Sequence, residues 1–264
     1  MASIEKQIEK YVIDGIKNVK PDVEIKENHT FRLKKTTDNF ITCPPALFDF
    51  HEYADSLKSS QAFAFNIFSG VKGVQFEYHM KAHNPDAQID VMIEDNSAVH
   101  LYEVKFTEFT KFPKIEFKDK YFVEKNYKLD NDVAKKYIAF IEDVREYFNT
   151  KNEKIYGEGI KQLCSHLLGI LNSIENSFKG KDVKLYSLCF DYPVSDEFND
   201  CVIKYKKVLE QFKKKVDSFL KDVNLDNRMM YCGFVSAKNF IEDKKELLGA
   251  ANTEYVKGRY FYRK

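Results

Sequence analysis

Two neighbouring apolar segments, 87–94 and 99–106, constrain the fold of this chain more than any other part of it. Each has the length and composition of a buried β-strand, yet each carries charge where such a strand would exclude it. Asp90 interrupts the first segment, and Glu103 and Lys105 lie near the end of the second. Ionisable groups in a buried strand cost free energy unless they are paired or used. These three residues therefore need an explanation.

Side chains alternate between the two faces of a strand, so Glu103 and Lys105 are predicted to share a face with Val99 and Leu101. That face changes from apolar to ionic along the strand, which is how a core-packed strand delivers side chains to a cleft at its end. The turn residues Asp95-Asn96-Ser97 predict a hairpin between the two segments. Such a hairpin would bring Asp90 within about two residues of register with Glu103.

Two carboxylates held that close together repel each other, and burial raises the cost further. A divalent cation would remove both penalties, and Mg²⁺ favours one or two carboxylates together with phosphate and water oxygens. Lys105 could then stabilise the negative charge of the pentavalent phosphorane or orient the attacking water. The alternative is a buried ion pair that only satisfies itself. Asp182-Val-Lys184, which also borders an apolar segment but follows no acidic strand, shows that the spacing alone proves little.

Asp90…Glu103-Val-Lys105 on consecutive strands, followed by a helix and another strand, resembles the PD-(D/E)XK nuclease superfamily over roughly residues 50–190. The resemblance implies an α/β restriction-endonuclease-like core: a central mixed sheet flanked by helices, with a helical insertion and a C-terminal helix. It also implies that Asp90 and Glu103 bind Mg²⁺ or Mn²⁺ and that Lys105 assists hydrolysis of DNA phosphodiester bonds. Many enzymes of this fold act as homodimers. The alternative function is a non-catalytic nucleic-acid-binding or regulatory protein on the same fold.

Further site residues follow from the same resemblance. Gln162 matches the glutamine of a Gln-x-x-x-Tyr motif on the next helix, with His166 where tyrosine is usual. Glu77 is the favoured additional acid and metal ligand, ahead of Glu52, and Asp90 is favoured over Asp86 because Asp86 lies in an apparent turn. Three polar residues among phenylalanines could line the site or bond locally: Ser60, Gln61 and Asn66.

The rest of the 264-residue chain indicates one α/β domain spanning 1–264. We predict helices over 3–18, 51–69, 130–148, 157–178 and 195–220, and strands over 74–80, 183–190 and 228–236. His79 and His83 are four residues apart, but we interpret that stretch as a strand and turn and not as a metal-binding helix. Five scattered cysteines and the absence of a signal peptide predict a cytoplasmic protein with reduced thiols. A net charge of +1 requires any nucleic-acid surface to be local, and no segment reaches the roughly 18 apolar residues of a membrane span.

Overall fold

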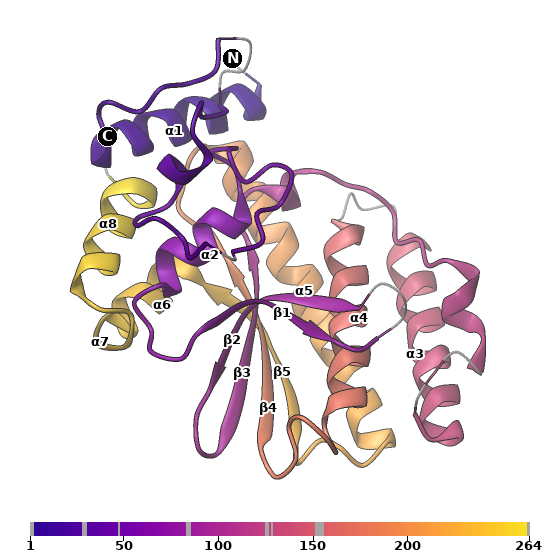
Figure 1. Cartoon of the computed structure of the whole chain (residues 1–264). Coiled ribbons are helices and arrows are strands. Elements are labelled where there is room, and N and C mark those ends of the chain that lie inside the picture. Colours follow the sequence, from indigo (N-terminus) through magenta and orange to yellow (C-terminus); the bar gives the residue numbers. More distant parts are fainter. Residues whose placement is uncertain are drawn as a thin grey trace.

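A five-stranded mixed sheet forms the centre of the molecule (Figure 1). The structure, a computed structural model, describes residues 3–27, 31–46, 48–82, 86–124, 127, 129–150 and 156–262. The strands follow one another in chain order: β1 (Gln75–Met80), β2 (Ala87–Glu94), β3 (Ala98–Lys105), β4 (Asp182–Cys189) and β5 (Met229–Ser236). β1, β2 and β3 are antiparallel neighbours, whereas β3, β4 and β5 run parallel. The predicted α/β class, with a mixed sheet flanked by helices, is confirmed.

The predicted hairpin between β2 and β3 is present. The Asp95 carboxylate accepts hydrogen bonds from the backbone N–H groups of Ser97 and Ala98, at 2.7 and 2.8 Å, and so closes the turn. Val91 pairs with Tyr102, so continuing the register by one residue places Asp90 opposite Glu103. The turn therefore sets which residues meet at the far end of the hairpin.

Helices cover both faces of the sheet (Figure 1). Consecutive residues of β3 show the two layers: the ring of Tyr102 packs against Phe68 of α2 (Ser60–Phe68), while Glu103 contacts His166 of α4 (Gly157–Ser173). The layer of α4 also holds α3 (Asn131–Thr150) and α5 (Asp196–Asp222), in the links between the parallel strands. The hydroxyl of Ser195 caps α5 by accepting a hydrogen bond from the Phe198 N–H.

The opposite layer contains α1 (Ile4–Val19), α2 and three helices after β5: α6 (Ala237–Asp243), α7 (Lys245–Leu248) and α8 (Ala250–Tyr260). The resemblance implied a C-terminal helix, but no residue range for a helix after 236 was predicted, because in α8 polar residues such as Asn252 and Arg259 fill the buried face where an apolar stripe would be expected. The predicted helix over 51–69 was too long. Only Ser60–Phe68 is helical, because Ser59 caps that helix and the preceding residues form turns. Short 3₁₀ turns cover Thr36–Asn39, Glu108–Thr110 and Asp119–Phe122.

β1 switches faces at Glu77. Phe76 and Tyr78 would share a face in a regular strand, yet Phe76 packs on Phe65 of α2 and Tyr78 contacts Phe178, which follows α4. Glu77 has a φ of 53°, a backbone conformation that costs a non-glycine residue free energy. The pairs that flank it, Phe76 with Val91 and Tyr78 with Ile89, set Glu77 at the level of Asp90. Three acids on three neighbouring strands thus meet at one level of the sheet.

Candidate active site

One cleft of about 390 Å³ brings the predicted site residues together. All four residues predicted to be catalytic line it, as does the additional acid, Glu77. Its full lining is His51, Ser60, Glu77, Asp86, Ala87, Gln88, Asp90, Glu103, Lys105, Glu108, Tyr156, Gln162, Ser165 and His166. The lining residues come from β1, β2, β3, α2, α4 and the loops beside them, so only the folded chain assembles this site.

β3 delivers Glu103 and Lys105 to the floor of the cleft. The ammonium Nζ of Lys105 lies 2.6 Å from Oε1 of Glu103 and donates a 2.8 Å hydrogen bond to Oε1 of Gln162 on α4. Both charged residues are recessed, with only 3% of Glu103 and 4% of Lys105 exposed. Burial lowers the pKa of Lys105, but the charges around it, Glu103 first and then Tyr156, Glu108 and Asp90, together outweigh burial and raise the pKa well above its ordinary value. Lys105 is therefore a permanent cation at neutral pH.

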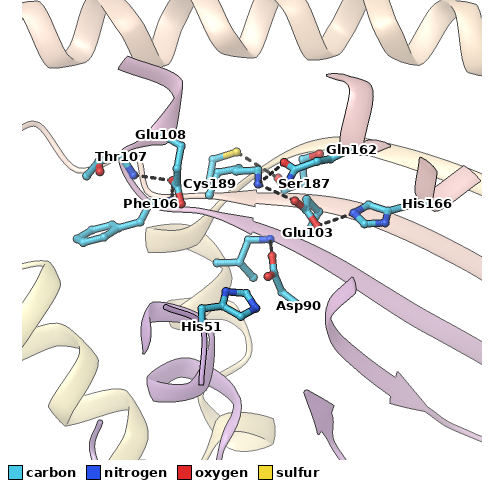
Figure 2. Close-up of polar contacts among 12 residues, drawn as sticks. His51, Asp90, Glu103, Phe106, Thr107, Glu108, Gln162, His166, Ser187 and Cys189 are labelled. Carbon is cyan, nitrogen blue, oxygen red and sulfur yellow. Dashed lines mark hydrogen bonds and ion pairs between the residues drawn. The ribbon is translucent and has the colours of Figure 1, made fainter. Parts of the chain in front are cut away.

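Glu103 is held by two partners. Oε1 faces Lys105, and Oε2 lies 2.7 Å from Nε2 of His166 (Figure 2). Burial raises the pKa of this carboxyl, yet Lys105 and His166 overcome burial and hold it at about 2. Glu103 is consequently an anion that only accepts hydrogen bonds, so Nε2 of His166 must be the donor.

Asp90 lies where the β2–β3 ladder ends. Its Oδ2 accepts a 2.6 Å hydrogen bond from the backbone N–H of Val104, so the side chain takes the place of a ladder partner (Figure 2). Burial, and then the negative charge of Glu103, raise the pKa of Asp90 well above its ordinary value. The two carboxyls are thus electrostatically opposed, and a cation or a proton placed between them would be stabilising.

Glu77 is positioned by two residues on the other wall. Its Oε1 accepts from Nε2 of Gln61, and its Oε2 lies 3.1 Å from Nε2 of His51. The hydrogen bond with Glu77 raises the pKa of His51, against the opposing effect of burial. His51 was not among the predicted site residues. Glu77 itself and Gln61, an unusual polar residue within an apolar helix, were the two members of this cluster that the sequence indicated.

Other predicted positions separate into lining and structural residues. Ser60 and the alternative ligand Asp86 line the cleft. Asn66 instead bonds to Ile41, Asn39 and Tyr260 in the buried contact between α2 and α8. Glu52 is exposed outside the lining, and His83 falls outside the described residues.

Two further lining residues with ionisable side chains, Glu108 and Tyr156, were not predicted. The carboxylate of Glu108 accepts hydrogen bonds from the N–H groups of Phe106 and Thr107, directly after β3 (Figure 2). Tyr156 precedes α4, and the centroid of its ring lies 6.0 Å from the Lys105 ammonium. Burial raises the pKa of its hydroxyl to about 12, so Tyr156 stays protonated as a potential donor. Both residues lie in loops, where no periodic pattern marks them.

The donor chemistry of Asp90 and Glu103 suits a hard divalent cation, since each ionised carboxylate has about four lone-pair positions and Glu103 uses two of them here. Across the described part of the chain, however, no three His, Cys, Asp or Glu side chains are arranged as a metal-binding group. Asp90 and Glu103 would supply two carboxylates to such a cation, with phosphate and water oxygens as further ligands, while Glu77 stays a predicted ligand. That is the coordination Mg²⁺ commonly adopts.

Comparison of the chain with protein-family models, with curated proteins and with solved structures finds no match in any of the three. No helix within the described residues combines the length and the apolar character needed to cross a bilayer.

Proposed function

We propose that this protein is a metal-dependent deoxyribonuclease with a restriction-endonuclease-like core. The observation that supports the proposal is the convergence of Asp90, Glu103, Lys105 and Gln162 in one cleft. Two opposed carboxylates beside a permanent cation are unfavourable as a purely structural arrangement, because an apolar core of the same shape is usually at least as stable. The same groups are the equipment that phosphodiester hydrolysis needs.

Each residue has a distinct role in the proposed reaction. Asp90 and Glu103 would hold Mg²⁺ or Mn²⁺, which when bound supplies Lewis-acid charge beside a phosphate oxygen. Lys105 stabilises the negative charge that develops on the phosphate oxygens, and its recessed position strengthens that interaction by excluding water. Gln162 fixes the ammonium through its 2.8 Å hydrogen bond, and His166 fixes the carboxylate of Glu103.

A second candidate is a non-catalytic DNA-binding or regulatory protein on the same fold. Two observations favour it: the ion pair between Lys105 and Glu103 is almost fully shielded, and no three-residue metal group is present in the described structure. In that protein, the polar side chains of the cleft would only pair with one another and would have no catalytic role. The two candidates differ in whether the residues of the cleft hydrolyse a phosphodiester bond.

The experiment is to incubate the purified protein with supercoiled plasmid and with linear single-stranded DNA, each with Mg²⁺, Mn²⁺ or EDTA. Lys105→Met keeps the aliphatic stem and removes the charge. Lys184→Met on β4 is the matched control, because Lys184 also stands two residues after an acidic residue, Asp182, and does not line the cleft. We expect metal-dependent cleavage that Lys105→Met abolishes and Lys184→Met retains. Cleavage by Lys105→Met at the rate of the unmodified protein would refute the assignment, and no cleavage of any substrate would favour the binding protein.

A further inference from the structure

A second groove, of about 510 Å³, opens beside the cleft and shares three lining residues with it: His51, Ser60 and Glu108. The remaining lining is Glu5, Phe31, Arg32, Tyr53, Ser56, Lys58, Ser59 and Lys111. The groove is therefore continuous with the candidate active site. A polymer that occupied the groove would reach the cleft without crossing open surface.

Two aromatic rings in this groove each lie under a cation. The guanidinium of Arg32 is 5.4 Å from the centroid of Tyr53, and the ammonium of Lys58 is 3.7 Å from the centroid of Phe31. Tyr53 is 58% exposed, so much of its ring is open to solvent although Arg32 lies over it. Its outer face is thus available for stacking while Arg32 holds its position.

The position of Arg32 is itself fixed. Its Nε and Nη2 both donate to the carboxylate of Asp55, which is buried and also pairs with Lys26 at 2.6 Å. Arg32 and Tyr53 therefore form a prearranged platform at the groove wall. Prearranged aromatic groups bind with little loss of conformational entropy.

The charges of the groove are only mildly positive. Arg32, Lys58 and the exposed Lys111 are offset by Glu5 and Glu108, and Lys58 lies 3.5 Å from Glu5. Net attraction for phosphate is therefore small, and stacking should contribute more to binding than charge does. An aromatic ring can stack on any of the four bases, but the base must be unpaired and accessible.

The depth of the active site also favours a single strand over a duplex. Glu103 and Lys105 are 3% and 4% exposed at the floor of the cleft, so a scissile phosphate must enter to reach them. A duplex is stiff over about 150 bp and holds its phosphates on a wide cylinder, whereas the backbone of a single strand can bend into a recessed cleft of about 390 Å³.

We propose that the groove binds an unpaired DNA strand, with a base stacked on Tyr53 and the backbone directed past His51 into the cleft. This inference rests on the proposed nuclease function, for which it names the substrate as single-stranded DNA. Lys111 contacts a phosphate in this arrangement, and Arg32 orients the stacking ring.

The test is fluorescence anisotropy in EDTA, so that binding is measured without cleavage. The probes are labelled oligo-dT and a labelled hairpin duplex of equal phosphate count. Tyr53→Ala removes the stacking ring, and Tyr53→Phe keeps it. Lys111→Gln removes the proposed phosphate contact. Its matched control is Lys214→Gln on α5, because both lysines are exposed. We expect tighter binding of oligo-dT than of the duplex and a loss of about fivefold or more in Tyr53→Ala. Tyr53→Phe should bind as the unmodified protein does, and Lys111→Gln should lose less than Tyr53→Ala but more than Lys214→Gln.

Equal affinity for the two probes, or unchanged affinity in Tyr53→Ala, would overturn the inference. Equal losses in Lys111→Gln and Lys214→Gln would show diffuse electrostatic binding, which also overturns it. These outcomes are separable from failure of the nuclease proposal. Strand binding that depends on Tyr53, without cleavage under any metal, refutes the nuclease and leaves the groove, whereas Lys105-dependent cleavage insensitive to Tyr53 refutes the groove alone.

Discussion

Nε2 of His166 lies 2.7 Å from Oε2 of Glu103, while its other ring nitrogen, Nδ1, is buried without a hydrogen-bond partner among the described residues. An orphaned polar atom costs free energy in a packed interior. The orientation of the imidazole therefore favours the hydrogen bond to Glu103, although it leaves Nδ1 without a partner. Such an arrangement is what a positioning residue of a functional carboxylate would show.

His166→Leu should consequently weaken the fold. Leucine has a similar volume but no donor, so the variant removes one of the two donors to a buried carboxylate, and we expect the free energy of unfolding to fall by about 1–3 kcal/mol. Urea denaturation followed by circular dichroism measures this loss. His100→Leu, at a partly exposed histidine of β3, is the control and should change stability by less than about 0.5 kcal/mol. An undiminished stability in His166→Leu would show that the contact with Glu103 contributes nothing.

Divalent cations should raise the thermal midpoint of the unmodified protein. A ligand that binds only the folded state stabilises it by about 2.7 kcal/mol at one hundred times its dissociation constant. Asp90→Asn and Glu103→Gln should each abolish the Mg²⁺-dependent shift, because each replaces a proposed ligand with a neutral isostere. Glu94→Gln, at an exposed carboxyl of β2, should retain it. A full shift in Glu103→Gln would exclude that residue as a ligand, whatever the cleavage assay shows.

Gln162→Ala should slow cleavage without abolishing it. The variant leaves Lys105 in place and removes the 2.8 Å hydrogen bond that orients its ammonium. Hydrogen bonds to charged groups contribute about 1.5–3 kcal/mol, which corresponds to a rate loss of about 10–150-fold. Single-turnover cleavage at saturating Mg²⁺ gives the rate. Gln211→Ala on α5 is the control, and a rate for Gln162→Ala equal to that of Lys105→Met would contradict a supporting role.

The central part of the site could be predicted because local rules determine it. Strand alternation placed Glu103 and Lys105 on one face, and the Asp95 turn fixed the register that brings Asp90 beside them. His51 could not be predicted in the same way, because it reaches the cleft from a loop. Glu77 was chosen for its sequence position, but its positive φ and the resulting switch of faces depend on contacts with two different helical layers. Tertiary contacts of that kind leave no periodic signal in the sequence.

Acid should lower the stability of the fold by protonating Asp55, which pairs with Arg32 and Lys26. Burial raises the pKa of this carboxyl, but hydrogen bonds from Arg32 and Lys26 outweigh burial and lower it below its ordinary value. The stabilisation is therefore fully present above the unfolded-state pKa of about 3.9 and is lost as the pH falls through the lower folded-state value. Asp55→Asn should lose about 1–3 kcal/mol at pH 7 and much less at pH 3. Denaturation curves at the two pH values measure the difference, and an equal loss at both would contradict the ion-pair explanation.

The contact between α1 and α8 depends on a glycine in each helix. A Cβ added at Gly15 would lie 2.2 Å from the backbone carbonyl oxygen of Arg259, which cannot move without shifting α8. A Cβ at Gly258 would lie 2.9 Å from Cγ1 of Val19, a side-chain end that can rotate. Replacing glycine with alanine within a helix normally gains up to about 1 kcal/mol, so the sign of each change depends on the clash. We expect Gly15→Ala to lower the free energy of unfolding by about 1–3 kcal/mol and Gly258→Ala to change it by less. Urea denaturation of the two variants checks the order, and a more stable Gly15→Ala would show that the two helices are not packed as closely as described.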